Sequence, residues 1–374
     1  MNKQVVHNKI AQITWITYTN YGTFLQAFAL QQVLNQLGYD SVIIDDSRLV
    51  NENISWKSRI LIFLSSIYHF NYFKNRKRQK LYDNFASSFL NIDYCWRDYE
   101  DVNSRYGIFV CGSDQIWSPL LPNHHNGFYF ASFTSENAKR IAYAPSLGCK
   151  TIPKAYASLT SKWLYRFAYL SARETSGTKI LEEITGRKDI ETVIDPTLLL
   201  SSEQWRCFEK TNSQLPSKIS GRRYLLAYFL TKNTTYISIA KKIAKEKRLT
   251  LVAINSIHGL SKYFDIIINC GPMEFLSVIA NAQYVVTDSF HGSIFAIHFK
   301  RPFLTLKRFA SDAPNSQNAR IENLFAKLEI CDNFLGEEDK FILPKEPNWS
   351  YIEKLLKSER SLSINYLKTA LSNG

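Results

Sequence analysis

Apolar and polar positions near the N-terminus alternate between strand and helix patterns. Residues 12–18 have strand composition, residues 20–22 have turn chemistry, and residues 24–37 place apolar side chains at helical spacing. Gly38 fits the C-cap of that helix, and residues 41–45 form a second apolar strand that ends in a carboxylate. This order of strand, loop, helix and strand predicts a parallel sheet with helices on its faces.

The same alternation continues along the chain. Further strands are predicted at residues 105–111, 140–144, 168–172, 191–194, 224–229, 249–254, 283–287 and 302–306. Helices are predicted from residue 174 through 181, from residue 201, and at residues 235–244, 272–281, 291–299, 318–328 and 351–371. We therefore expect an α/β fold of two open domains that face each other across a cleft, with ligands at the carboxyl ends of the strands.

A polar stretch at residues 210–223 is the best candidate for an inter-domain linker, since it contains a proline and a glycine. The predicted domains are an N-terminal α/β domain at 1–210 and a C-terminal α/β domain at 222–335. A helical segment at 336–374 completes the chain.

Composition narrows the class of protein. The chain is 45% hydrophobic and 14% aromatic, which excludes a disordered polypeptide. No pair among the six cysteines has CxxC spacing, so no zinc knuckle or dithiol redox motif is encoded, and we expect buried thiols in a reducing compartment. The sequence suggests neither a signal peptide nor an apolar run long enough to span a bilayer, so we expect a cytoplasmic protein.

The charge balance points to an anionic partner. Lys and Arg number 46 against 33 Asp and Glu, a formal net charge of +13. Phosphate substrates, nucleic acid and an acidic membrane surface all fit. Residues 57–80 hold seven basic and no acidic residues around an apolar stretch, which is typical of a membrane-surface segment. An ordinary helix with a solvated charged end explains that pattern equally well. No recognised nucleic-acid motif accompanies the charge, so we expect no nucleic-acid partner.

The most informative motif lies at residues 287–293. An apolar strand ends in Thr-Asp-Ser, and Phe-His-Gly-Ser then opens a helix. Backbone N–H groups at a helix N-terminus attract an anion, and Gly292 would let a phosphate or carboxylate approach the backbone. His291 could donate to that anion or move a proton. The alternative is that these residues only cap the helix and form its turn.

Three further segments place polar residues at strand ends or turns. Arg173 could clamp a carboxylate or phosphate, although an ion pair with Glu174 or a neighbouring helix explains it too. Residues 112–117 suit sugar binding, with Trp117 stacking on the ring; the alternative is a turn with a packed Trp. Residues 20–26 are a turn leading into a helix, and they lack the glycines of a dinucleotide site.

Taken together, these segments resemble the polysaccharide pyruvyl transferase family. The resemblance rests on the order of the motifs and covers nearly the whole chain. The motifs are residues 20–27, 37–39, 109–117, 139–145, 171–174, 194–198, 282, 284–292, 300–303 and 319–321.

The resemblance implies two Rossmann-like domains of the glycosyltransferase-B type. It further implies transfer of a pyruvyl group from phosphoenolpyruvate to two hydroxyls of a sugar, forming a cyclic ketal and releasing phosphate. The acceptor would belong to a capsule or exopolysaccharide or be its lipid-linked oligosaccharide precursor. Residues 1–210 would then be the acceptor side and residues 222–335 the donor side. Phosphoenolpyruvate is a co-substrate, and no metal or other cofactor is implied.

The resemblance also implies roles for single residues. His291 is the candidate general acid or phosphate ligand, and Asp114 or Glu174 the candidate base. The expected donor-binding residues are Arg173, Ser289, His291, Gly292, Ser293, Lys307 and Arg320. The expected acceptor-binding residues are Asn20, Tyr21, Gly22, Gln26, Ser113, Asp114, Gln115 and Trp117. Some family members carry Arg at the position of Ser289, so which cation replaces it here is open.

Two other readings of the sequence compete with this one. A nucleotide-sugar glycosyltransferase of the same fold would bind a nucleotide sugar instead of releasing phosphate from phosphoenolpyruvate, and fold alone does not fix chemistry. A non-catalytic basic protein bound to membrane or nucleic acid would keep its function when His291 is replaced.

The basic segment generates a first prediction. Replacing its basic residues Lys57, Arg59, Lys74, Arg76, Lys77, Arg78 and Lys80 with neutral ones should weaken binding to anionic vesicles, because each lost cation removes attraction to the lipid surface. Vesicle co-sedimentation measures this. Unchanged binding would mean that the segment is not a membrane patch and that the basic excess has another origin.

Overall fold

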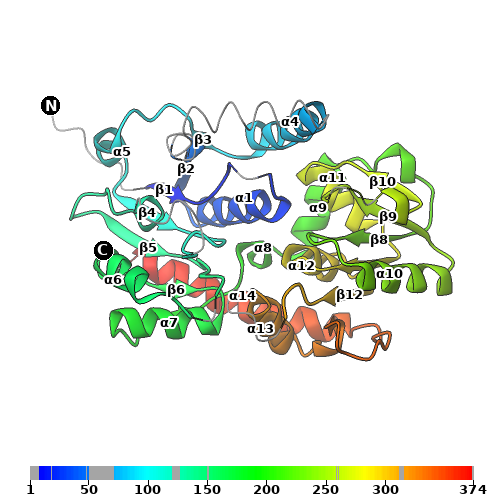
Figure 1. Cartoon of the computed structure of the whole chain (residues 1–374). Coiled ribbons are helices and arrows are strands. Elements are labelled where there is room, and N and C mark those ends of the chain that lie inside the picture. Colours follow the sequence, from blue (N-terminus) through cyan, green and yellow to red (C-terminus); the bar gives the residue numbers. More distant parts are fainter. Residues whose placement is uncertain are drawn as a thin grey trace. The chain divides into compact units, whose positions relative to one another are not determined.

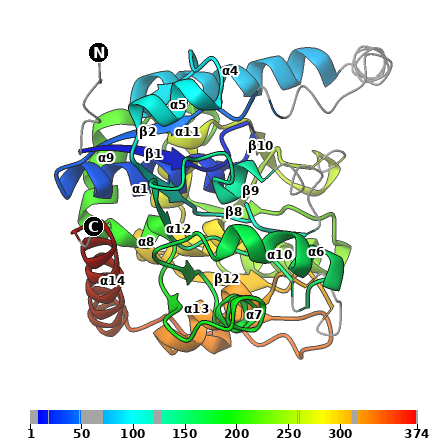
Figure 2. The ribbon, with the colours of Figure 1, turned by 90° about the vertical axis from the view of Figure 1, so that its left-hand side faces the viewer.

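The computed structural model describes residues 8–17, 19–47, 49, 71–119, 127–149, 151–257, 259, 261–310 and 316–372 (Figures 1 and 2). Contacts divide the chain into two compact units. Unit 1 comprises Met1–Leu199 and Glu359–Gly374, and unit 2 comprises Leu200–Ser358. Each unit is described by itself.

Unit 1 is built on a parallel five-stranded sheet in the order β3-β2-β1-β4-β5. Its strands are β1 (Lys9–Ile13), β2 (Asp40–Ile44), β3 (Ile92–Asp93), β4 (Ile108–Cys111) and β5 (Lys139–Ala142), with a separate pair β6 (Ser171–Ala172) and β7 (Glu191–Thr192). Its helices are α1 (Tyr21–Gln36), α4 (Asn71–Phe89), α5 (Tyr99–Arg105), α6 (Lys154–Leu164), α7 (Thr175–Thr185) and α8 (Pro196–Leu199). The chain runs from β1 to β2 on one side and later to β4 on the other, so the strand order reverses beside β1, where such sheets bind ligands.

The first helix shows how the sequence sets local structure. The Asn20 side chain caps α1 by accepting a hydrogen bond from the Gly22 N–H at 2.9 Å. Gly38 has φ 93°, a left-handed conformation that ends the helix and that glycine adopts without strain. Both ends confirm the predicted helix. The preceding strand stops at Ile13, earlier than the predicted 12–18, because its neighbour β4 ends at Cys111 opposite Ile13.

Unit 2 carries a parallel six-stranded sheet in the order β10-β9-β8-β11-β12-β13. Its strands are β8 (Tyr224–Tyr228), β9 (Thr250–Ile254), β10 (Ile266–Ile268), β11 (Tyr284–Thr287), β12 (Phe303–Leu306) and β13 (Phe334–Leu335). Its helices are α9 (Ser202–Asn212), α10 (Thr234–Glu246), α11 (Pro272–Ala280), α12 (Phe290–His298) and α13 (Ala319–Leu328). Helix α10 packs against β8 and β9, and α12 against β11 and β12 (Figure 1). The predicted α/β class with two Rossmann-like units is confirmed.

The division of the chain differs from the predicted linker at 210–223. Helix α9 begins with a capping box between Ser201 and Gln204 and packs against α11 and α12, so it belongs to unit 2. The last helix, α14 (Trp349–Ser372), contributes to both units. Its final part binds unit 1, where the Tyr366 hydroxyl donates to the Ala142 carbonyl at 2.8 Å. Residues 336–374 are therefore not a separate segment.

The basic segment at residues 57–80 is only partly described, since residues 57–70 lie outside the described ranges. Helix α4 covers its last ten residues, and the side chains of Arg76, Lys77 and Lys80 are exposed. Arg78 instead donates to the Thr19 carbonyl at 2.9 Å. Its guanidinium also lies over the rings of Tyr21 and Tyr82. Arg78 therefore joins α4 to the residues at the start of α1 and is not part of an open basic surface.

A buried carboxyl group lies just beyond β2. Asp46 is fully buried, and the Tyr129 hydroxyl donates to its Oδ2 at 2.8 Å. Its other oxygen has no hydrogen-bond partner among the residues that the structure describes. Burial raises the pKa of Asp46 to about 6, against the lowering effect of the Tyr129 hydrogen bond, and the Asp45 charge raises it further.

This carboxyl should make the stability of the fold depend on pH. The pKa of the Asp46 carboxyl is higher in the folded protein than in the unfolded chain. The free energy of unfolding therefore keeps the full contribution of the protonated carboxyl below about pH 4, and it loses that contribution as pH rises through about 6. Asp46→Asn cannot ionise and escapes that loss. The variant should therefore gain about 3 kcal/mol relative to wild type between about pH 4 and pH 7, measured by urea unfolding.

The exposed Asp332 provides the control, and Asp332→Asn should follow the wild-type pH dependence. If Asp46→Asn also follows wild type across this range, the Asp46 carboxyl does not titrate as described.

Candidate functional site

Helix α12 begins after β11 at Phe290, as predicted, and the residues before it cap the helix. The Ser289 Oγ accepts a hydrogen bond from the Gly292 N–H at 3.3 Å. The Asp288 carboxylate accepts from the N–H groups of Leu230 at 2.6 Å and Thr231 at 3.0 Å, which lie after β8. Burial raises the pKa of Asp288, and these hydrogen bonds oppose the shift. Asp288 thus joins the carboxyl ends of β8 and β11.

Gly292 and Ser293 face the sheet. A Cβ on Gly292 would lie 2.5 Å from the Thr287 Oγ1, so this glycine permits close packing of α12 on β11. Ser293 is fully buried; its hydroxyl donates to the Ser289 carbonyl at 3.0 Å and shares a hydrogen bond of 2.8 Å with Thr305. The contacts of these two residues are packing contacts, and their predicted role in binding the donor stays a prediction.

His291 lies in the first turn of α12, where backbone N–H groups favour an anion. Its side chain is largely buried, and its ring meets the edge of the Phe290 ring at a centroid distance of 5.2 Å. The Arg320 guanidinium lies 5.6 Å from the centre of that Phe290 ring and donates to the Gln317 side chain at 2.7 Å. The structure therefore brings His291 and Arg320 together around Phe290, as two members of the predicted donor set.

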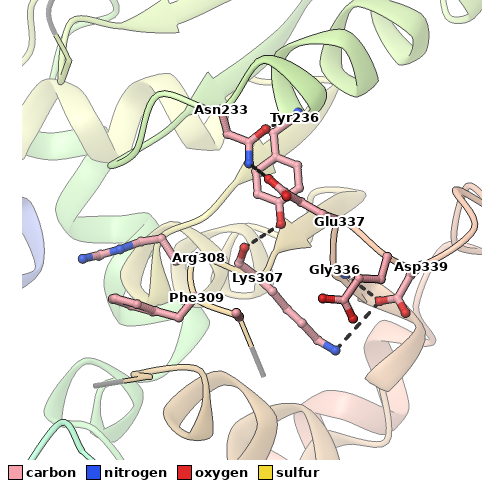
Figure 3. A pocket seen from close by; sticks show the side chains of 10 residues that line it. Asn233, Tyr236, Lys307, Arg308, Phe309, Gly336, Glu337 and Asp339 are labelled. Carbon is pink, nitrogen blue, oxygen red and sulfur yellow. Dashed lines mark hydrogen bonds and ion pairs between the residues drawn. The ribbon is translucent and has the colours of Figure 1, made fainter. Parts of the chain in front are cut away.

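Lys307 lines a cavity of about 190 Å³ after β12 and β13, and Arg308 lines the same cavity (Figure 3). Its Nζ lies 3.8 Å from the Asp339 carboxylate, and its carbonyl accepts from the Tyr236 hydroxyl at 2.6 Å. The acidic residues Glu337 and Glu338 also line this cavity. Lys307 therefore sits among carboxylates that repel an anionic donor.

In unit 1, the predicted Arg173 is a buried ion-pair centre. Its Nη1 lies 2.6 Å from Asp195 and its Nη2 3.5 Å from Asp114, and its side chain is only 2% exposed. Asp195 is held in turn by the N–H and hydroxyl of Thr197 at 2.9 and 2.6 Å. With Glu174 adjacent, one cation stands among three carboxylates, and this net negative environment disfavours a phosphate. Arg173 orders acidic side chains here instead of facing a donor.

Asp114 is the most accessible carboxylate of this cluster. It follows β4 in a left-handed conformation (φ 72°), and its Oδ2 accepts from the Thr23 hydroxyl at 2.9 Å. Glu174 accepts through Oε1 from the Ser146 hydroxyl at 2.7 Å, while its buried Oε2 has no hydrogen-bond partner within the described ranges. Both predicted bases therefore lie at the carboxyl edge of unit 1, and each is oriented by a hydroxyl group.

Buried polar side chains next to Asp114 hold its backbone in position. The Ser113 N–H donates to the Gln26 Oε1 at 3.0 Å, and the Gln26 Nε2 donates to the Thr14 hydroxyl at 2.9 Å. Gln26 and Ser113 are both fully buried. They connect α1 to the ends of β1 and β4, so their role is to position Asp114.

The remaining predicted acceptor residues are mostly structural. Trp117 is fully buried; its indole N–H donates to the Tyr129 carbonyl, and its ring stacks on Phe130 at 5.0 Å. It therefore presents no face to a sugar. Tyr21 is buried against Tyr82, and Asn20 and Gly22 form the helix cap already described. Gln115 differs, since its buried Nε2 has no hydrogen-bond partner among the described residues.

The motifs did not single out three residues that the structure brings to these sites. Asp195 and Thr23 hold the acidic cluster, and Arg308 follows Lys307 after β12. Asp195 stands in the quoted motif at residues 194–198, so that motif could have revealed its role.

In the described part of the chain, no group of three His, Cys, Asp or Glu side chains could hold a metal ion. Nor does any helix there have the length and apolar character needed to cross a bilayer.

Comparisons with known proteins support the sequence motifs. A family model described as "Polysaccharide pyruvyl transferase" matches residues 20–308, which confirms the resemblance. The solved structures to which the chain is similar include UDP-GlcNAc 2-epimerase from Neisseria meningitidis bound to UDP-GlcNAc, with 9% identity, 96% of this chain and 100% of that chain covered, and a TM-score of 0.47. S. aureus MnaA with UDP has 11% identity, 94% and 87% coverage, and a TM-score of 0.49. The glycosyltransferase SnogD from Streptomyces nogalater has 11% identity, 97% coverage of both chains, and a TM-score of 0.42. No curated protein matches the chain.

The Arg173 ion pairs predict a stability effect that a donor-binding role does not. Arg173→Met should destabilise the protein by about 3–5 kcal/mol, because it leaves the Asp195 and Asp114 carboxylates buried without their cation. Adding Asp195→Asn should recover part of that loss. Urea unfolding measures both.

Arg97 is the matched control, since its side chain is 80% exposed in an ion pair with Asp101; Arg97→Met should change stability by less than about 1 kcal/mol. An Arg173→Met protein as stable as wild type, yet deficient in donor binding, would restore the role predicted from the sequence.

Proposed function

Because the chain belongs to the polysaccharide pyruvyl transferase family, we propose that it moves a pyruvyl group from phosphoenolpyruvate onto two hydroxyls of one sugar. The product is a cyclic ketal, and inorganic phosphate is released. The acceptor is a sugar of a surface polysaccharide, of the capsule or exopolysaccharide class, or its lipid-linked precursor. The family match over residues 20–308 carries the proposal, since it includes both the Asp114 and the His291 regions.

The donor end of this scheme is the start of α12. A phosphoenolpyruvate bound there meets backbone N–H groups, the Arg320 guanidinium and the His291 ring. A protonated His291 gives its proton to the methylene carbon of the donor, while a sugar hydroxyl attacks the adjacent carbon. The second hydroxyl then closes the ketal as phosphate leaves. Of the two hydroxyl protons, one replaces the proton that His291 gave to the new methyl group, by way of the base and solvent, and the other leaves with phosphate or solvent.

The acceptor end is the acidic cluster of unit 1. Sugar hydroxyls are neutral donors, so carboxylates suit them better than they suit an anionic donor. Asp114 accepts the hydroxyl proton in our proposal, because it is the most accessible of the three carboxylates around Arg173. Glu174 is the second candidate base, since one of its oxygens has no hydrogen-bond partner in the described part of the chain.

No metal ion or nucleotide takes part in this scheme, and phosphoenolpyruvate is the co-substrate. A lipid-linked acceptor would place the enzyme at the inner face of the membrane. The exposed Arg76, Lys77 and Lys80 on α4 support such a peripheral position on a cytoplasmic protein.

The decisive experiment measures phosphate release from phosphoenolpyruvate with a panel of galactosyl, mannosyl and glucosaminyl acceptors. Wild type should release phosphate with at least one acceptor. His291→Ala should lower turnover by about 10²–10⁴-fold, because a positioned acid contributes that much.

His298 provides a control on the same helix, where it contacts Ser202 away from the first turn. A folded His298→Gln protein should keep turnover near wild type. Full activity of His291→Ala would remove His291 from the chemistry. Turnover of a nucleotide sugar, with none of phosphoenolpyruvate, would replace the proposal by a glycosyltransferase.

A further inference from the structure

Arg308 lies at the same sheet edge as the start of α12. It follows β12, which pairs in parallel with β11 so that Thr305 stands opposite Thr287. The residues after these two strands therefore emerge side by side: Asp288 after β11 and Arg308 after β12. Their charges interact, since the Arg308 cation opposes the burial-driven rise in the pKa of Asp288.

Within the described ranges, the Arg308 guanidinium has no oxygen partner. It makes no hydrogen bond or ion pair with any residue that the structure describes, and its Nε is buried without a partner. The guanidinium carbon lies 4.9 Å from the centre of the Phe309 ring. The Asp288 carboxylate does not take up the hydrogen-bond donors of Arg308, because its oxygens already accept hydrogen bonds from Leu230 and Thr231.

The other cations of this region are engaged. Lys307 pairs with Asp339, and Arg320 donates to Gln317. Figure 3 shows Lys307 turning toward Asp339 while the Arg308 side chain extends in the opposite direction, away from Glu337 and Asp339. Arg308 is therefore the half-buried guanidinium at this edge whose donors remain available. Such a fork binds an oxyanion through two parallel hydrogen bonds.

We propose that Arg308 binds the phosphate group of the anionic donor at the carboxyl end of β12. The inference rests on the proposed function, because it takes phosphoenolpyruvate as the donor. Some family members carry Arg at the position of Ser289, and the inference names Arg308 as the cation that replaces that Arg in this chain. It prefers Arg308 to the neighbouring Lys307. The Asp288 charge keeps the site balanced when no anion is bound, and the Phe309 ring supports the flat guanidinium.

Isothermal titration calorimetry with phosphoenolpyruvate and, separately, with inorganic phosphate tests this assignment. Arg308→Gln should weaken the binding of both by about 10- to 100-fold, the effect of losing charge-assisted hydrogen bonds. Arg308→Lys should lie between this variant and wild type, because an ammonium keeps the charge but loses the fork. Both variants should leave the free energy of unfolding nearly unchanged, since Arg308 has no described hydrogen-bond or ion-pair partner and only its charge interaction with Asp288 is affected.

Arg223 is the matched control: an exposed arginine of the same unit that precedes β8, at the amino end of the sheet. Arg223→Gln should bind both anions as wild type does. Unchanged anion binding by Arg308→Gln would overturn the inference and leave the proposed function standing, as would a loss seen in Lys307→Gln but not in Arg308→Gln.

The two proposals fail in different ways. If wild type binds inorganic phosphate through Arg308 but releases no phosphate from phosphoenolpyruvate with any acceptor, the anion site holds and the proposed function fails. If wild type binds neither anion, both fail.

Discussion

The buried ion pairs of Arg173 are the interaction on which the acidic site of unit 1 depends. Burying a charge without a partner costs several kcal/mol, so Arg173 must have carboxylates around it. Asp195 satisfies this requirement at 2.6 Å and Asp114 more weakly at 3.5 Å. Asp195 comes from the loop after β7 and Asp114 from the turn after β4. One guanidinium therefore orients Asp114 while the stronger pair holds the loops in place.

The two units arrange their charged side chains differently at their carboxyl edges. Unit 1 surrounds one cation with carboxylates, and this favours neutral hydroxyl ligands over anions. Unit 2 gathers Arg308, Arg320 and His291 after β11 and β12, with Asp288 already saturated by backbone N–H groups. Our proposal uses this difference to give the first unit the acceptor role and the second the donor role, the sides that the family resemblance implies.

The motifs predicted both candidate sites from polar residues that follow apolar strands, because such residues meet at one edge of a parallel sheet. They could not distinguish ligand-facing residues from packing residues. Trp117 suits a sugar by composition, yet its ring fills the core beside Phe130. Gly292 suits an anion, yet its missing Cβ makes room for Thr287. Lys307 and Arg308 are adjacent in sequence and line the same cavity, and only the tertiary structure shows that Lys307 turns to Asp339 while Arg308 extends away from it.

The sequence by itself determined the order of strands and helices, the caps at Asn20 and Ser289, and the family, because each depends on residues close together in the chain. The tertiary structure alone decided which carboxylates pair with Arg173 and that Arg308 has no hydrogen-bond or ion-pair partner in the described part of the chain. It also decided that the end of α14 belongs to unit 1, where Tyr366 reaches Ala142 across more than two hundred residues. Such pairings depend on contacts between distant segments, which no local pattern encodes.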